Sequence, residues 1–196
     1  MKKFMNFVFI SLLATSIVLV GCGEDEEEEP AVVSDIVGSW SLAPIDGSIQ
    51  VGPGDGDYSW WGIPAADTQT RSCAWDDVWT FGEDGSFTQD LGTDTWLETW
   101  QGVDEGCGAP VAPHVSGSFT YELAEDESTV TIDGAGAFVA LAKMNNEGEL
   151  GTDQAPASIP SSITYNIHSL TPATMVLRIS AGTDPVVHWE FTLNKK

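Results

Sequence analysis

The sequence predicts one all-β domain whose strands form an antiparallel meander, closed as an up-and-down barrel or folded as a β-sandwich. Two observations predict it. Beyond Ile36, apolar and polar residues alternate in segment after segment, with no sustained helical period. Short turns rich in glycine, proline and acidic residues separate these segments, which is typical of small barrels and sandwiches.

The alternation is clearest in four runs in which every second side chain is large and apolar. These runs are residues 119–123, 163–167, 175–179 and 187–193. Because neighbouring residues of a strand point to opposite faces, each run presents one apolar face to a core. The turns expected around the strands are residues 82–85, 124–128, 170–174 and 181–185.

Two segments interrupt the meander. Residues 103–116 are predicted to form a proline-rich loop, and residues 143–162 a long connection with few apolar residues and two prolines. Loops of this length in a compact domain are usually functional or mobile.

Residues 1–21 are predicted to be an export signal that is not part of the fold. Lys2 and Lys3 give a positive start, an apolar stretch follows, and a small residue precedes Cys22. The stretch is too short and wrongly flanked for a transmembrane helix. Residues 19–22, LVGC, resemble the bacterial lipobox, which implies a lipid on Cys22. An ordinary signal peptide or a retained membrane anchor is the alternative.

Residues 22–35 include six consecutive acidic residues, so we expect a disordered tether before a domain at residues 36–196. The tether is similar to the acidic stretch of surface-exported Bacteroidota lipoproteins; a plain spacer is the alternative. The chain has 7 basic and 30 acidic residues, and losing Lys2 and Lys3 leaves 5 against 30, a formal charge of −25. This charge repels nucleic acid and anionic lipid, so membrane attachment is expected through the lipid alone.

Three cysteines fit an exported protein. With Cys22 used for the anchor, Cys73 and Cys107 remain as an even pair. In an oxidising compartment they are expected to form a disulfide that closes a long loop. Free buried thiols or metal ligands are the alternatives.

Two stretches resemble the lipocalins. Gly38 and Trp40 form the Gly-x-Trp pair that opens the first lipocalin strand, and residues 73–87, followed by a second cysteine, look like lipocalin-like domains of Bacteroidota lipoproteins. The resemblance implies a lipocalin-like barrel in which a basic residue of a closing strand packs across Trp40. Arg178 is the residue predicted for that role. A second lipocalin motif is not found.

A further resemblance covers most of residues 36–193. The motifs SWSLAP, VGPGDGDYSWW, TRSCAWDD, DGSF, TWLETWQG and CGAPVAPH are similar to a module of marine Bacteroidota. That module is appended to laminarinase-type (family 16) glycoside hydrolases and to related β-glucan-utilisation proteins. The resemblance implies association with polysaccharide.

Tryptophan is concentrated near glycine, proline and aspartate, where it can either fill a core or form a flat surface for a ligand. If residues 57–61 form a strand, Trp60 and Trp61 point to opposite faces, and one is expected inside and the other outside. By the same rule residues 75, 77, 79 and 81 share a face, as do residues 96, 98 and 100. In both rows tryptophan alternates with a carboxylate.

Such rows suit a sugar site, because indoles stack on the apolar face of a sugar ring and carboxylates accept hydrogen bonds from its hydroxyls. The candidate glycan-binding residues are Trp60, Trp61, Trp75, Asp77, Trp96, Glu98 and Trp100. The alternative is that these side chains fill the barrel, with Glu98 or Asp77 paired to Arg71.

No cofactor or metal is expected. The spacing of His114, His168 and His188 fits no metal-ligand pattern. Residues 54–57, GDGD, could give a structural calcium site two carboxylates, but a glycine-rich turn is the default because no further ligands follow. The chain has no E-x-D-x-x-E strand motif, nucleophile elbow or phosphate loop, so we expect no enzymatic activity.

The sequence therefore predicts a non-catalytic glycan-binding lipoprotein on the outer membrane. We expect it to face the cell surface, with the periplasmic face as the alternative, and to work beside glycan-uptake proteins. The ligand predicted from the resemblance is a neutral β-glucan of the laminarin type. The alternatives are a barrel carrier of a small apolar ligand and a structural subunit of an outer-membrane complex.

Overall fold

The computed structural model describes residues 33–152, 155, 158–183 and 186–196. They belong to one compact unit, Val33–Lys196. The predicted signal peptide, the lipid on Cys22 and the tether up to residue 32 lie outside the described residues. Among the described residues, no helix has the length and apolar character needed to cross a membrane.

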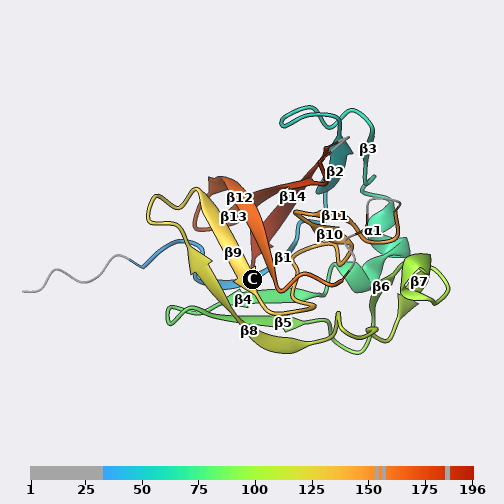
Figure 1. Cartoon of the computed structure of the whole chain (residues 1–196), viewed down its shortest axis with the longest axis horizontal. Helices are drawn as coiled ribbons and strands as arrows, with labels where there is room; N and C mark the ends of the chain where they lie inside the picture. Colours follow the sequence, from blue (N-terminus) through green and yellow to red (C-terminus); the bar gives the residue numbers. More distant parts are fainter. Residues whose placement is uncertain (1–32, 153–154, 156–157, 184–185) are drawn as a thin grey trace, which may run out of the picture. The chain divides into compact units, whose positions relative to one another are not determined.

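Eight strands close into an antiparallel up-and-down barrel (Figure 1). In spatial order they are β1 (Gly38–Leu42), β4 (Val78–Phe81), β5 (Ser86–Asp90), β8 (Gly117–Leu123), β9 (Thr129–Asp133), β12 (Ser162–Leu170), β13 (Thr174–Ala181) and β14 (Val187–Lys195). The sheet closes on itself because β1 pairs with β14, with Leu42 opposite Leu193. The predicted all-β barrel, the architecture of which lipocalins are an example, is confirmed. The sandwich alternative is wrong.

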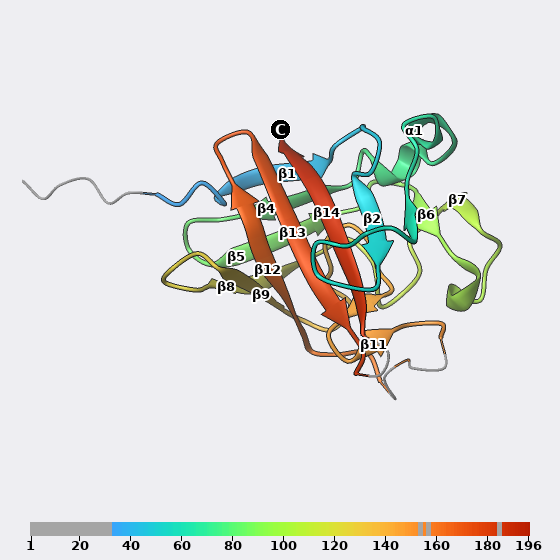
Figure 2. The same ribbon diagram turned by 90° about the horizontal axis from the view of Figure 1, so that it is seen from above.

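The four alternating runs lie in β8, β12, β13 and β14, and they supply much of the core. In β13 and β14, Leu177 pairs with Phe191 and Ile179 with Trp189, and all four side chains are buried. Complete burial of one such side chain stabilises the fold by about 1.5–3 kcal/mol. Figure 2 shows β12, β13, β14 and β2 crossing over β1, β4, β5 and β8.

Short elements extend the barrel. They are β2 (Ile49–Gly52), β3 (Trp61–Gly62), α1 (Asp67–Thr70), η1 (Ser72–Ala74), β6 (Thr95–Leu97), η2 (Thr99–Gln101), β7 (Gly106–Gly108), β10 (Met144–Asn145) and β11 (Gly148–Glu149). β2 pairs with residues 188–191 of β14 and carries β3 on its other side. The two predicted long loops contain β7 and the β10–β11 hairpin.

Residues 134–143, which we call the interior segment, pack against inward-facing side chains of the barrel. Phe138 and Val139 are buried. The backbone N–H of Phe138 donates to Gln89 Oε1, and that of Val139 donates to the Tyr165 hydroxyl, both at 2.9 Å. Gly136 is required here because its φ is +91° and a Cβ would clash with the backbone of Pro113. The chain's own backbone therefore occupies part of the barrel.

The basic residue that packs across Trp40 is Lys195, so the prediction for Arg178 is wrong. Lys195 lies opposite Trp40 in the β1–β14 pair, and its Nζ is 5.2 Å from the ring centroid. Arg178 points outward, because its neighbours Leu177 and Ile179 face the core. Gly38 and Trp40 do open the first strand of the barrel, and the Trp40 indole is completely buried.

Candidate binding site

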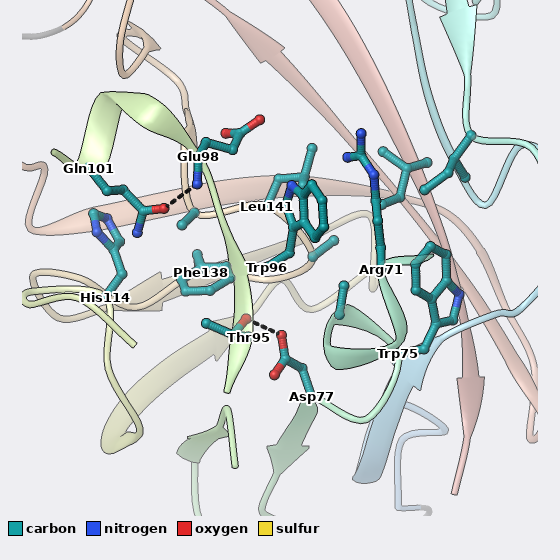
Figure 3. A pocket seen from close by; sticks show the side chains of 15 residues that line it. Arg71, Trp75, Asp77, Thr95, Trp96, Glu98, Gln101, His114, Phe138 and Leu141 are labelled. Atoms are coloured by element: carbon teal, nitrogen blue, oxygen red, sulfur yellow. Dashed lines mark hydrogen bonds between the residues drawn. The ribbon is translucent and has the colours of Figure 1, made fainter. Parts of the chain in front are cut away.

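Two adjoining pockets lie at the end of the barrel where α1, β6 and β7 are found (Figure 1). We call them the inner and the outer pocket, and together the mouth groove. The inner pocket, shown in Figure 3, has a free volume of about 30 Å³ and the outer pocket one of about 280 Å³. Ile49, Arg71, Glu98 and Leu141 line both, so the two pockets adjoin.

Four of the eight tryptophans line the mouth groove. Trp75 and Trp96 line the inner pocket, and Trp61 and Trp189 line the outer one. Trp61 is 40% exposed, whereas Trp189 is only 6% exposed. Of these two indoles, Trp61 is therefore the more accessible to a ligand.

The Cys73–Cys107 disulfide is confirmed, and it joins two walls of the groove. Cys73 lies in η1, two residues after Arg71 and two before Trp75. Cys107 lies in β7, directly opposite Trp96 of β6. The bridge therefore fixes the segment that carries Arg71 against the strand that carries Trp96.

Arg71 contacts Trp96 instead of pairing with Asp77 or Glu98. Its guanidinium lies over the Trp96 indole, 4.2 Å from the ring centroid, and its Nη2 is 3.8 Å from a carboxylate oxygen of Glu105. The alternative in which Arg71 neutralises a buried acid is therefore wrong. One face of the Trp96 ring is covered by a cation.

Lys143 occupies the other side of the groove. Its Nζ lies 3.6 Å from a Glu98 oxygen, 3.9 Å from a Glu149 oxygen and 4.8 Å from the centroid of the Trp189 ring. The Trp189 indole N–H donates to Glu149 at 2.7 Å. Lys143, Glu98 and Glu149 thus form a network of one cation and two acids that holds Trp189.

Trp96, Glu98 and Trp100 do not form one strand face. β6 ends at Leu97, because the Glu98 N–H donates to the Gln101 side chain at 2.9 Å and the next residues form η2. Trp96 and Glu98 line the groove, whereas Trp100 lines neither pocket. The Trp100 indole N–H donates to Glu98 Oε2 at 2.8 Å, so Trp100 orients Glu98.

Asp77 is the most deeply buried acid of the groove, with 2% of its surface exposed. Its Oδ2 accepts a hydrogen bond from the Thr95 hydroxyl at 2.7 Å (Figure 3). Burial raises the pKa of Asp77 from 3.8 to about 7, and repulsion by Asp76, Asp90 and Asp94 adds to the rise, although the Thr95 bond lowers it. Asp77 therefore titrates near neutral pH.

His114 also lines the inner pocket, where it packs edge-on against Trp100 and Phe138 with ring centroids 5.5 and 5.9 Å away. Burial lowers the pKa of His114 from 6.5 to about 4. The imidazole is therefore neutral at physiological pH.

The structure corrects the remaining tryptophan predictions. Trp60 and Trp61 are both exposed, by 54% and 40%, and only Trp61 reaches the groove. Trp75 and Asp77 precede β4, which begins at Val78, so they do not share a strand face with Trp79. They nevertheless line the inner pocket.

Lys143 and Trp189 line the groove but were not predicted as site residues, and neither was Glu149, which contacts both of them but lines neither pocket. They come from the interior segment, the β10–β11 hairpin and β14, which are far apart in the sequence from β6. No local pattern marks them. Their proximity depends on how the long connection folds back over the barrel.

Neither metal candidate has the geometry of a complete site. Asp55 pairs with Arg178 at 3.1 Å, and an oxygen of Asp57 accepts the Ser59 N–H at 3.2 Å, as in a turn. In the described part of the chain, Cys73, Cys107 and Asp94 are close enough to hold an ion. The two sulfurs of that group are already joined to each other.

The sequence matches no protein-family model and no curated protein. Two solved structures are similar. A lipocalin-like protein from Bacteroides uniformis is 13% identical, with 83% of this chain and 99% of that chain covered and a TM-score of 0.36. An uncharacterized protein from Bacteroides eggerthii is 14% identical, with 82% and 98% covered and a TM-score of 0.34.

Proposed function

We propose that this protein is a non-catalytic binding protein whose mouth groove holds a neutral glycan, a β-glucan of the laminarin type. The observation that carries the proposal is the composition of the groove. Four tryptophans share it with two basic side chains, Arg71 and Lys143, each close to a carboxylate, and with two acidic ones: Glu98, which pairs with Lys143, and Asp77, which accepts a hydrogen bond from Thr95. Indoles offer flat apolar faces to a sugar ring, and the charged groups offer donors and acceptors to its hydroxyls.

The charge of the groove supports a neutral ligand. Arg71 and Lys143 are the basic residues that line it, and each lies within 4 Å of a carboxylate. An anionic sugar would have to compete with Glu98, Glu105 and Glu149 for these cations. The net negative charge of the whole chain adds to that disadvantage.

The barrel fold also raises the alternative of a carrier for a small apolar ligand. The described interior favours the groove over this alternative. Trp40, Trp79, Phe87 and Tyr165 are completely buried inside the barrel, together with Val139 of the interior segment. A carrier of this fold would need to displace these side chains or the segment itself.

We further propose that a lipid on Cys22 anchors the protein to the outer membrane, on the cell surface beside glycan-uptake proteins. The LVGC motif and the acidic tether support this proposal. Replacement Cys22→Ser should move the protein from the membrane fraction to the soluble fraction. Unchanged partitioning, with no lipid on the wild-type N-terminus, would refute the anchor.

The function is tested by calorimetry on the full-length chain with laminarin, mixed-linkage glucan and alginate, plus a long-chain fatty acid. Binding of a neutral glucan with little dependence on salt is expected, because exposed charges contribute little to a neutral ligand. Binding of the fatty acid alone would favour the carrier. Binding of alginate alone would contradict the neutral-ligand argument.

A further inference from the structure

The inner pocket contains a carboxylate oxygen that the fold does not satisfy. Asp77 Oδ2 accepts from Thr95, but Asp77 Oδ1 is buried and has no hydrogen-bond partner among the described residues. Buried polar atoms in proteins nearly always have a partner, and an unpaired one that lines a pocket is a place where a water or a ligand group can bind. Asp77 lines the inner pocket, so a ligand group that occupies this pocket would lie beside its carboxylate.

A second unpaired group lines the same pocket. The indole N–H of Trp96 is buried and has no acceptor in the described part of the chain. A hydroxyl both donates and accepts, so one sugar hydroxyl could donate to Asp77 and another could accept from Trp96. The free volume of about 30 Å³ is room for two water-sized groups, each needing ~10–15 Å³.

We propose that the inner pocket is a subsite for a hydroxyl or hydroxymethyl group of the bound sugar, and that Asp77 is the specificity-determining residue that accepts its hydrogen bond. This inference rests on the proposed glycan-binding function and adds a selection rule to it. A ring with a hydroxyl at the position that enters the pocket binds. A ring lacking it, or carrying a carboxylate or sulfate there, does not.

The surroundings of Asp77 explain the exclusion of an anion. Asp76, Asp90 and Asp94 already repel charge on Asp77. Of the groups that line the same pocket, Glu98 is a further acid, Arg71 is engaged with Trp96, and His114 is neutral. A second negative charge in the pocket would meet no free cation among these residues.

The pH dependence of binding provides a signature that packing alone would not give. The ionised form of Asp77 accepts a hydroxyl hydrogen more strongly than the protonated form does. Because the pKa of Asp77 is about 7, affinity should rise as the pH increases through 7. The pKa of His114 is about 4, so its charge state does not change between pH 5.5 and pH 8.5, the range of the titration.

The experiment is a calorimetric titration of the full-length chain with laminarin between pH 5.5 and 8.5. The wild type should bind about tenfold more tightly at pH 8.5 than at pH 5.5. Asp77→Asn, which preserves the bond from Thr95, should bind about tenfold more weakly at pH 8.5 and show a flat profile. Asp76→Asn, an exposed neighbour that lines neither pocket, is the matched control: it should keep the wild-type affinity at pH 8.5 and a pH-dependent profile, with the midpoint moved downward because Asp76 raises the pKa of Asp77.

A second variant keeps the test independent of whether Asp77→Asn folds. The Thr95 hydroxyl lowers the pKa of Asp77, so Thr95→Val should move the midpoint of the wild-type pH profile upward. Glucan binding with a flat wild-type profile, or an Asp77→Asn variant with unchanged affinity, would overturn the subsite and leave the glycan-binding function in place. Failure of every neutral glucan to bind would overturn both.

Discussion

The guanidinium of Arg71 lies 4.2 Å from the centroid of the Trp96 indole, and both side chains line the inner pocket. The contact holds the flexible arginine side chain against a flat ring at the wall of a binding groove. The Cys73–Cys107 disulfide joins the segment that carries Arg71 to β7, and β7 pairs with the strand that carries Trp96. The orientation of Trp96 is therefore set before any ligand binds. Preorganisation of this kind reduces the entropy lost on binding.

Replacement Arg71→Met should therefore weaken laminarin binding by about two- to fivefold, the equivalent of ~0.5–1 kcal/mol for an exposed cation–π contact. Methionine keeps the apolar stem but removes the charge over the ring. Calorimetry measures the effect. Arg178→Met is the matched control, because Arg178 lies over Tyr58 at 5.6 Å and lines neither pocket. Equal weakening by both variants would contradict a role for Arg71 in positioning Trp96.

Trp60 and Trp61 are neighbours in the sequence, and only Trp61 lines the groove, so replacing each in turn tests whether the groove binds the glycan. Trp61→Ala should weaken laminarin binding about tenfold, because stacking of one aromatic ring contributes on the order of 1–1.5 kcal/mol. Trp60→Ala should have little effect, since Trp60 is just as exposed but lies outside both pockets. Affinity electrophoresis in laminarin gels compares the two. A larger loss for Trp60→Ala would move the site away from the groove.

The barrel could be predicted from the sequence because alternation is a local property of each strand. The burial of Met175, Leu177 and Ile179 in β13 follows from their spacing alone. Strand pairing is not local. Lys195, and not Arg178, covers Trp40 because the β1–β14 register places Lys195 opposite it, and no periodicity specifies that register.

The groove was only partly predictable for the same reason. Of the seven candidate glycan-binding residues, Trp61, Trp75, Asp77, Trp96 and Glu98 line the groove and Trp60 and Trp100 do not, and the glycan-binding role stays a prediction. The expected burial of either Trp60 or Trp61 was wrong, because β3 is two residues long and pairs only with β2, outside the closed barrel. Lys143 and Trp189 reach the groove through tertiary packing.

Reduction of the Cys73–Cys107 disulfide should lower both stability and affinity. The bridge joins residues 34 apart, and in the chain-entropy model such a loop stabilises the fold by about 3–4 kcal/mol. Cys73→Ala/Cys107→Ala, compared with the wild type by urea unfolding and calorimetry, should show both losses. Lower stability with unchanged laminarin affinity would show that the bridge does not organise the groove.

Asp77 and His114, the two groups of the inner pocket with shifted pKa values, should have opposite effects on the pH dependence of stability. The folded-state pKa of Asp77, about 7, lies above its ordinary 3.8, so the folded state binds more protons than the unfolded state between these values. Its contribution to the free energy of unfolding is therefore fully present below about pH 4 and is lost as the pH rises through 7. The pKa of His114, about 4, lies below its ordinary 6.5, so its contribution is present above pH 6.5 and is lost as the pH falls through 4.

Single replacements should separate these opposing contributions. Relative to the wild type, Asp77→Asn should gain about 3 kcal/mol of unfolding free energy between pH 4 and pH 7.5, because it lacks the carboxylate that must ionise in a buried site. His114→Gln should change in the opposite direction, losing about 3 kcal/mol relative to the wild type over the same rise in pH. Urea unfolding at each pH measures both differences, and the other titrating groups cancel because each variant is compared with the wild type. Parallel stability curves for Asp77→Asn and the wild type would show that Asp77 keeps an ordinary pKa, and the acceptor in the inner pocket would then be ionised throughout the range used for binding.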